Sequence, residues 1–296
     1  MTEPSTDPCF RLSFGVGVAE NKNSKYRPTM EDVHTYVANF AERLDWGYFA
    51  VFDGHAGKLT AKWCGNNLHA ILEEEMAQNE TQDLRVTLNN TFTKADEALK
   101  EQPGNSGCTA AVAVLRWELT ELEAESPALA DAPFDFVPTA NHRRVLYTAN
   151  VGDSRVVLCR WGKAYRLSYD HKGSDINEAA RISNAGGIMI KSRVNGMLAV
   201  TRSLGDSYMK DLVVGNPFAT ATEITKDDSF VIIACDGLWD VCTDQQAVEL
   251  INNVEDPDAA ARKLVNHAMN KLTTDNITVM VIRLDKRVFE YKGKAV

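Results

Sequence analysis

The chemically most informative residues of this sequence are acids that follow predicted strands or lie in tight turns. Asp53 and Asp236 each precede a glycine and each follow an apolar run, at 47–52 and 230–235. Strand ends in a mixed sheet bring together residues that are far apart in sequence. We therefore expect one site to contain most of these acids, which are Glu31, Asp32, Asp53, Asp153, Asp236, Asp240 and Asp275.

Such a site needs cations. Converging carboxylates without lysines could not all ionise, because like charges raise each other's pKa. Bound divalent metals would remove that conflict, and oxygen ligands without paired His or Cys suit Mg²⁺ or Mn²⁺ better than zinc or copper. The pattern alone leaves a second interpretation open, that of ordinary turn aspartates, because Asp-Gly is a common turn signal.

The six cysteines argue against other chemistries. No pair has CxxC spacing, which is the usual signature of a zinc knuckle or a dithiol redox site. None is followed six residues later by arginine, as a nucleophilic phosphatase cysteine would be. We expect buried, reduced thiols that pack as small hydrophobic side chains.

The elements that must position the acids follow from hydrophobic periodicity. Apolar residues at helical spacing predict helices at 58–76, 82–100, 175–184, 244–254 and 257–271. Apolar runs of strand length predict strands at 14–19, 47–52, 109–117, 145–151, 155–160, 164–168, 230–235 and 277–284. No linker divides the chain, so we expect one folded domain.

Composition bounds the partners. The chain has 296 residues, of which 44% are hydrophobic and 25% charged, as in an ordinary soluble protein. A net charge of −9 makes nucleic acid an unsuitable main partner. No run approaches the ~20 apolar residues of a membrane span. The first residues lack a signal peptide and an N-terminal myristoylation glycine, so we expect no membrane association and a cytoplasmic or nuclear location.

Seven ordered motifs resemble the metal-dependent Ser/Thr protein phosphatases of type 2C. They are RPTMED (27–32), VFDGHAG (51–57), GCTA (107–110), NVGDSR (150–155), AVTRSLGD (199–206), ACDGLWDV (234–241) and TDNITV (274–279). The resemblance implies an α+β fold, a four-layer α-β-β-α sandwich with two central antiparallel sheets. It places the catalytic domain at 13–284, after a leader at 1–12 and before a flexible basic tail at 285–296.

The resemblance also implies residue roles. Asp53 would bridge two Mg²⁺ or Mn²⁺ ions, with the Gly54 carbonyl and Glu31 as further ligands. Asp236 and Asp275 would hold the second ion, and Asp32 would orient a metal-bound water. Asp153 and Asp240, with Asp236, match positions that hold a weaker third metal in some members.

For catalysis, the resemblance implies that a metal-bridging water or hydroxide attacks the phosphorus in line. Arg27 would bind the phosphate, and His55 would protonate the leaving serine or threonine oxygen. A segment at 171–210, with Arg193 and Arg202, corresponds to the flap beside the cleft. It either shapes substrate choice or is a structural loop packed through Met189, Met197 and Leu198. The acidic stretch at 118–141, which has no lysine or arginine, is expected to be a solvated hairpin insertion.

Three functions follow from the sequence. The first is a phosphoprotein phosphatase, and the second is a scaffold that keeps the fold without hydrolysis. The third is a hydrolase of small phosphate esters or nucleotides, which the missing Walker loop disfavours. Motifs and size resemble small fungal members that counteract stress-activated MAP kinase signalling. That resemblance implies negative regulation of a MAP kinase. Separately, we expect a monomer.

Overall fold

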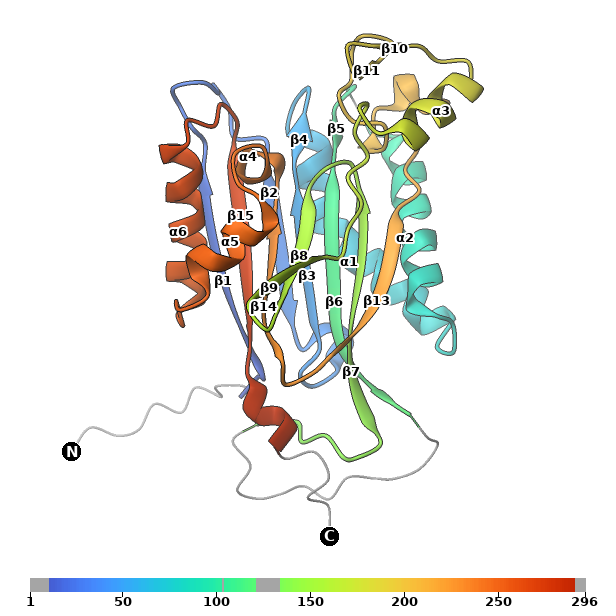
Figure 1. Cartoon of the computed structure of the whole chain (residues 1–296). Coiled ribbons are helices and arrows are strands. Elements are labelled where there is room, and N and C mark those ends of the chain that lie inside the picture. The colour runs from blue at the N-terminus through green and yellow to red at the C-terminus, as the bar shows by residue number, and fades with distance from the viewer. Residues whose placement is uncertain (1–10, 103, 121–133, 291–296) are drawn as a thin grey trace, which may run out of the picture.

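Two five-stranded antiparallel sheets face each other at the centre of the molecule (Figure 1). The computed structural model describes residues 11–102, 104–120 and 134–290. The first sheet has the order β1 (Phe14–Asn21), β15 (Ile277–Leu284), β14 (Asp228–Ala234), β8 (Arg155–Arg160) and β9 (Lys163–Arg166). The second has the order β13 (Phe218–Ile224), β7 (His142–Val151), β6 (Ala110–Leu119), β3 (Gly47–Phe52) and β2 (Val33–Ala38).

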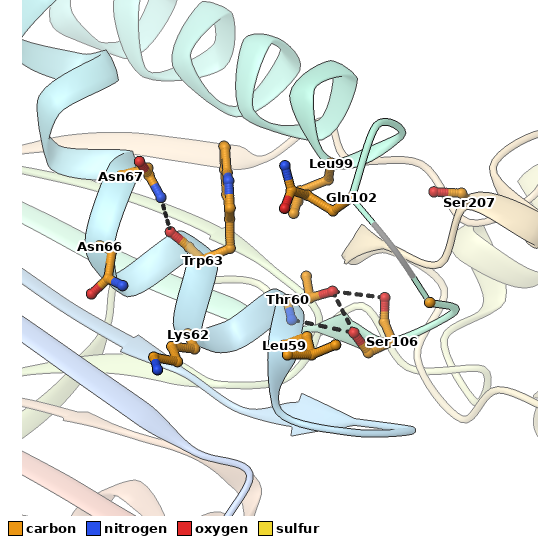
Figure 2. A pocket seen from close by; sticks show the side chains of 11 residues that line it. Leu59, Thr60, Lys62, Trp63, Asn66, Asn67, Leu99, Gln102, Ser106 and Ser207 are labelled. Carbon is orange, nitrogen blue, oxygen red and sulfur yellow. Dashed lines mark hydrogen bonds between the residues drawn. The ribbon is translucent and has the colours of Figure 1, made fainter.

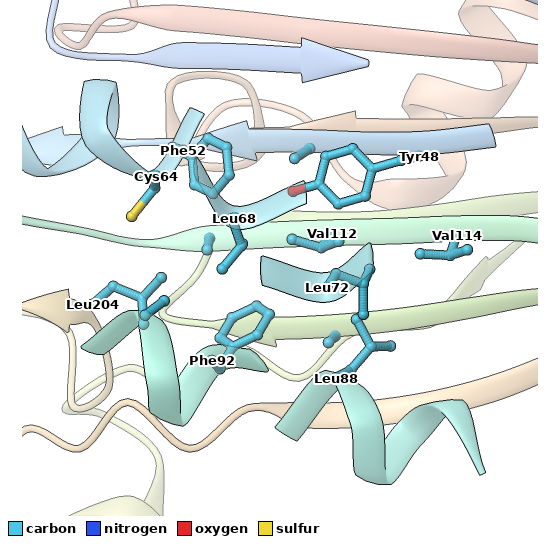
Figure 3. Close-up of a cluster of buried hydrophobic side chains, with 14 of the residues drawn as sticks. Tyr48, Phe52, Cys64, Leu68, Leu72, Leu88, Phe92, Val112, Val114 and Leu204 are labelled. Atoms are coloured by element: carbon cyan, nitrogen blue, oxygen red, sulfur yellow. The ribbon is translucent and has the colours of Figure 1, made fainter. Parts of the chain in front are cut away.

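Helices cover the outer face of each sheet. The helices α1 (Leu59–Gln78) and α2 (Leu84–Leu99) pack on the second sheet. The first sheet is covered by α4 (Asp236–Trp239), α5 (Asp244–Ile251) and α6 (Pro257–Asn270). Figure 3 shows the cluster under α1 and α2, where Leu68, Leu72, Leu88 and Phe92 meet strand residues such as Phe52 and Val112. The predicted α-β-β-α sandwich is confirmed.

Central strands are buried on both faces, which explains their continuous apolar runs. In β14, Phe230 and Ile232 pack toward the helices, while Val231 and Ile233 pack into the layer between the sheets. All four side chains are at most 1% exposed. This alternation holds the two sheets at a fixed spacing and brings their strand ends to a common edge.

A small third sheet and the flap lie at one end of the sandwich (Figure 1). The sheet joins β4 (Gly54–His55), β5 (Gly107–Cys108) and β12 (Leu204–Gly205), with β5 in the middle. The flap contains α3 (Ile176–Asn184) and the hairpin of β10 (Met189–Ile190) and β11 (Arg193–Val194). A 3-10 turn, η2 (Ser207–Met209), follows β12, and another, η1 (Phe40–Glu42), joins β2 to β3.

The described ends of the insertion and the first residues of the tail are more ordered than the sequence suggested. Residues 121–133 and 291–296, like 1–10 of the leader, lie outside the described residues. The strands β6 and β7 pair as far as Leu119 and His142, so the insertion does extend a hairpin. Its far end is not simply solvated, however, because Phe134 is buried in a cluster with Trp117 and Val288. The tail was expected to be flexible, yet its first part forms a 3-10 turn, η3 (Lys286–Glu290), which supplies Val288 to that cluster.

No helix in the described part of the chain is long and apolar enough to cross a membrane.

Candidate active site

A polar cleft of about 540 Å³ opens at the end of the sandwich that carries β4 and the flap. It contains most of the predicted site residues. Asp32 and Asp240 contact this group from outside the lining. The lining residues are Arg27, Glu31, Asp53, Gly54, His55, Ala56, Thr109, Asp153, Arg193, Met197, Leu198, Ala199, Val200, Tyr208, Asp236 and Asp275.

Close backbone contacts fix the loops that carry the acids. A side chain on Gly54 would place its Cβ 2.5 Å from the Glu31 carbonyl oxygen, so only glycine permits this approach. The Glu31 N–H donates to the Asn276 side chain at 2.9 Å, and the Asn276 amide donates in turn to the carbonyl oxygens of Lys22 and Thr29. The loop before β2 is thereby tied to the start of β15. This links Glu31 to Asp275, which lie far apart in sequence.

Asp53, at the end of β3, lies at the centre of the carboxylates. Burial raises its pKa well above the ordinary value, and the neighbouring Asp32, Asp236, Asp153 and Asp275 raise it further. A carboxyl group in this environment either stays protonated and neutral or needs a nearby cation to ionise. The predicted convergence around Asp53 is therefore present in the fold.

Asp236 is the first residue of α4, and its carboxyl group has a similarly unfavourable electrostatic environment. Burial, followed by the charges of Asp153, Asp240 and Asp275, raises its pKa well above the ordinary value. Its Oδ1 atom is buried and has no hydrogen-bond partner among the described residues. A buried oxygen without a donor is costly, and a bound metal ion would satisfy it. The donor set of carboxylates and a backbone carbonyl fits Mg²⁺ or Mn²⁺.

Asp32 lies behind the cleft and is held rigidly. Its Oδ2 accepts hydrogen bonds from Thr278 Oγ1 at 2.8 Å and from Cys235 Sγ at 3.3 Å. Burial raises its pKa to about 6, against the lowering effect of those two bonds. Potential ligand atoms of Asp32, Asp53 and Cys235 lie within 4.8 Å of one another.

The surroundings of Cys235 favour the thiol, which donates to Asp32. Burial and the charges of Asp32, Asp53 and Asp236 raise its pKa well above the ordinary value. A protonated thiol is neither a metal ligand nor a nucleophile. The five cysteines of the described residues are all buried and free, as the sequence predicted.

One cation among the acids was missed by the sequence analysis. The Nζ atom of Lys172, from the segment before α3, lies 3.3 Å from Asp153 Oδ2 and 3.0 Å from Asp240 Oδ1. The expectation that no lysine accompanies the acids is therefore wrong. Lys172 lies 19 residues after Asp153 and 68 before Asp240 in the numbering, so no local pattern could place it.

Arg27 and His55, which the resemblance assigns to phosphate binding and proton donation, both lie at the cleft. Arg27 donates from Nη2 to Asp275 Oδ2 at 2.5 Å and from Nε to the Thr274 carbonyl at 3.2 Å, while its side chain remains 47% exposed. His55 follows Gly54 on β4, and its side chain is 28% exposed. Both line the cleft together with Asp53 and Asp236.

The flap has exposed residues at the cleft and a packed core of its own. Arg193 and the exposed Met197 line the cleft. Leu198 and Val200 also line it, and they pack into a core with Ile182 of α3. Arg202 does not face the cleft, because its guanidinium binds the buried Glu178 carboxylate. Five further residues line the cleft without an individual role predicted from the sequence, and of these only Tyr208 lies outside the seven motifs: Ala56, Thr109, Ala199, Val200 and Tyr208.

The carboxylate-lined cleft at one end of the α-β-β-α sandwich has the donor groups that a metal-dependent hydrolase needs. Comparison with known proteins specifies the family. The profile described as "Protein phosphatase 2C" matches residues 16–277. The chain belongs to this family and is a metal-dependent protein serine/threonine phosphatase, which confirms the resemblance found in its motifs.

Two fungal relatives are similar over most of their length. "Protein phosphatase 2C homolog 1" of Saccharomyces cerevisiae is 58% identical over 93% of this chain and 95% of the relative. The protein of the same name from Schizosaccharomyces pombe is 45% identical over 91% of this chain and 73% of the relative. A crystal structure of a phosphatase from Toxoplasma gondii shares the fold, with a TM-score of 0.75, 22% identity and coverage of 94% of both chains.

Proposed function

We propose that this phosphatase hydrolyses phosphothreonine and phosphoserine in proteins through the carboxylate cluster around Asp53. The observation that carries the proposal is the buried Asp53 with four acids around it, beside an Asp236 oxygen that lacks a partner. Glu31, Asp53, the Gly54 carbonyl, Asp236 and Asp275 would hold two Mg²⁺ or Mn²⁺ ions. When bound, such ions activate water for in-line attack and neutralise the phosphoryl oxygens.

The other cleft residues would bind and orient. Arg27 offers a planar guanidinium to two phosphate oxygens while Asp275 and the Thr274 carbonyl fix its position. Asp32, rigidly held by Thr278, would accept a proton from the attacking water and orient it. His55 would donate a proton to the leaving serine or threonine oxygen, which is a poor leaving group as an alkoxide.

A direct assay tests the proposal. Purified protein should release phosphate from a phosphothreonine peptide with Mn²⁺ or Mg²⁺, and EDTA should stop the release. A phosphotyrosine peptide and a nucleotide are the controls that separate protein phosphatase activity from hydrolysis of other phosphate esters. Silence over a wide range of metal concentrations would contradict the proposal and favour the scaffold function.

Arg27→Ala is expected to raise KM for the phosphopeptide about 10- to 100-fold, because a charged hydrogen bond contributes about 1.5–3 kcal/mol. Arg27→Lys should recover only part of the loss, since lysine cannot offer two parallel donors. Steady-state kinetics measure both, with the exposed Arg262→Ala on α6 as the matched control. An unchanged KM in Arg27→Ala would remove this residue from phosphate binding.

The number of metals is a further part of the proposal. We propose two ions at the cleft floor and infer that Lys172 competes with a third at Asp153 and Asp240, because its ammonium lies between those carboxylates. Lys172→Met keeps the side-chain stem and removes the charge. It should tighten binding of a third Mn²⁺ at least about tenfold, since two charges near 4 Å interact by about 4 kcal/mol at a protein surface.

Mn²⁺ titration followed by EPR measures this stoichiometry without an activity assay. Lys163→Met, an exposed lysine on β9, is the control. Equal Mn²⁺ isotherms for wild type and Lys172→Met would show that the ammonium does not compete.

For the physiological substrate, we propose phosphothreonine in the activation loop of a stress MAP kinase. Support comes from the small fungal members that the motifs resemble. A doubly phosphorylated activation-loop peptide should lose phosphate from threonine, and loss from tyrosine alone would overturn the proposal. The cytoplasmic or nuclear location and the monomeric state stay predictions.

A further inference from the structure

A fully buried carboxylate that none of these roles uses lies against His55. The Oδ2 atom of Asp206 is 2.7 Å from His55 Nε2, and the Asp206 side chain is 0% exposed. Asp206 is not part of the cleft lining. The largest charge effects on the raised pKa of Asp53 and Asp236 come from other acids, among them Asp153 and Asp275, and Asp206 is not among the proposed metal ligands.

The small sheet at the end of the sandwich brings the two residues together. Its middle strand places Gly107 opposite His55 of β4 on one side and opposite Gly205 of β12 on the other. A Cβ on Gly107 would lie 2.1 Å from Asp206 Oδ2 and 2.5 Å from His55 Nε2. The His55–Asp206 contact therefore occupies the space that any other residue at position 107 would fill.

Asp206 is held in one position by its backbone and by Ser203. Its N–H donates to the Ser106 carbonyl at 3.2 Å, and its left-handed φ of 48° turns the chain toward His55. Ser203 Oγ donates to Oδ2 at 2.5 Å. Figure 2 shows how Thr60, at the start of α1, hydrogen bonds to Ser106, including Oγ1 to the Ser106 carbonyl at 2.8 Å.

The charge of Asp206 has no other cationic partner among the described residues. Among the described residues His55 is the only basic side chain within 4 Å of its carboxylate, and its Oδ1 is buried without a hydrogen-bond partner. Burying a carboxylate with so few partners is unfavourable. An asparagine would fill the same space at lower cost, so the contact to His55 accounts for an acid at this position.

We propose that Asp206 is a positioning residue for His55. It accepts the Nε2–H of the ring and fixes the ring plane, so that Nδ1 is the nitrogen that serves the substrate. An aspartate that orients a catalytic imidazole and sets its tautomer acts in the same way in Ser-His-Asp hydrolases. The inference rests on the proposed role of His55 as the general acid.

The proton balance follows from this arrangement. As the bond between phosphorus and the serine or threonine oxygen breaks, its electron pair stays on that oxygen. The oxygen takes the proton of Nδ1, and the N–H electron pair stays on Nδ1. His55 is left neutral. Its remaining proton stays on Nε2 and is donated in a hydrogen bond to Asp206. A ring free to rotate would seldom present Nδ1–H along the line of the breaking bond.

The test compares two leaving groups in Asp206→Asn. Hydrolysis of a phosphothreonine peptide needs a proton on the leaving oxygen, whereas p-nitrophenolate leaves readily without one. We expect kcat for the peptide to fall about 100-fold, and kcat for p-nitrophenyl phosphate to fall less than about threefold. KM for both substrates and the Mn²⁺ affinity should not change. Asp211→Asn, an exposed neighbour on the same loop, is the control.

The His55 variants separate the two parts of the proposal. His55→Gln should show the same substrate selectivity, and the double variant should be no slower than His55→Gln alone, because the two residues act as one unit. If kcat of His55→Gln does not fall more for the phosphopeptide than for p-nitrophenyl phosphate, the general-acid role of His55 fails. The positioning role is overturned if His55→Gln shows this selective fall in kcat and Asp206→Asn does not. It is also overturned if Asp206→Asn lowers kcat equally for both substrates. Should Asp206→Asn not fold, Ser203→Ala serves as the second variant, because it removes one hydrogen-bond donor to Asp206 Oδ2. It must show the same selective fall in kcat for the phosphopeptide, with a smaller fold-change.

Discussion

Asp236→Asn is expected to lose phosphopeptide hydrolysis while its metal-free form becomes more stable than metal-free wild type. The loss follows from the removal of a proposed metal ligand. Metals at such sites supply several kcal/mol of transition-state stabilisation, so kcat should fall at least about 1,000-fold. Mn²⁺ affinity should fall at least about 100-fold, because even residues that only support ligands contribute 10- to 100-fold.

The gain in stability follows from the raised pKa of Asp236. A carboxyl group whose folded pKa lies above its unfolded value of 3.8 takes up protons on folding. The free energy of unfolding therefore falls as pH rises above about 4, and the loss is complete above the folded pKa. Asp32, with a folded pKa of about 6, contributes in the same direction between these values. Asparagine at 236 removes one charge from this group.

Thermal unfolding in EDTA at pH 5 and pH 7.5 measures the effect. The Tm difference between Asp236→Asn and wild type should be positive and larger at pH 7.5. His171 acts in the opposite direction, because burial lowers its pKa to about 4, but it cancels in the difference between the two proteins. Added Mn²⁺ should raise the Tm of wild type more than that of the variant. A metal-free variant that is less stable at pH 7.5 would contradict the argument, and Asp211→Asn is the matched control.

The central strands and most helices could be predicted from the sequence because their apolar patterns are local. The strands β2 and β13 could not, although both belong to the second sheet. They are its two edges. In β13 Ala and Thr alternate from 219 to 222, and in β2 His34 and Thr35 interrupt the apolar residues, so neither strand begins with a long apolar run. The period-2 alternation of Thr and Ala in β13 is a signal that could have found it.

The two-residue strands β4, β5 and β12 had no local signal at all. They pair residues that are far apart in sequence, Gly54 with Cys108 and Gly107 with Gly205. The same limit applies to the site. The acids could be predicted because each follows its own strand or turn, but the partners Lys172 and Asp206 are set by tertiary contacts. Asp206 is 151 residues from His55.

Glu178→Gln is expected to loosen the flap and lower the free energy of unfolding by about 3 kcal/mol at pH 7. Glu178 of α3 is 3% exposed, and its carboxylate accepts hydrogen bonds from Arg181, Arg202 and Thr201. The donor atoms Arg202 Nη2 and Thr201 Oγ1 lie at 2.6 Å and 2.8 Å. Burial alone would raise its pKa, but the hydrogen bonds from Arg202, Arg181 and Thr201 lower it from 4.5 to about 2. Glutamine keeps the shape and leaves two guanidinium groups without a charged partner.

The pH dependence has the opposite sign to that of Asp236. A folded pKa below the unfolded value stabilises the protein above pH 4.5, and the contribution is lost as pH falls toward 2. The stability difference between wild type and Glu178→Gln, measured by urea unfolding, should therefore shrink below pH 4.5. Glu223→Gln, an exposed glutamate on β13, should show no such difference. A constant difference down to pH 3 would show that packing, not charge, explains the loss.

The functional consequence is expected in substrate binding rather than in chemistry. Thr201 and Arg202 directly follow Ala199 and Val200, which line the cleft, so the Glu178 carboxylate fixes that wall. Amide hydrogen exchange should rise in α3 and at 193–202, while exchange in β15 should follow only the global stability. KM for a phosphopeptide should rise several-fold more than KM for p-nitrophenyl phosphate, because the smaller substrate needs fewer contacts beyond the phosphate. Equal changes in both would assign Glu178 to stability alone and leave substrate selection to the exposed flap residues Arg193 and Met197.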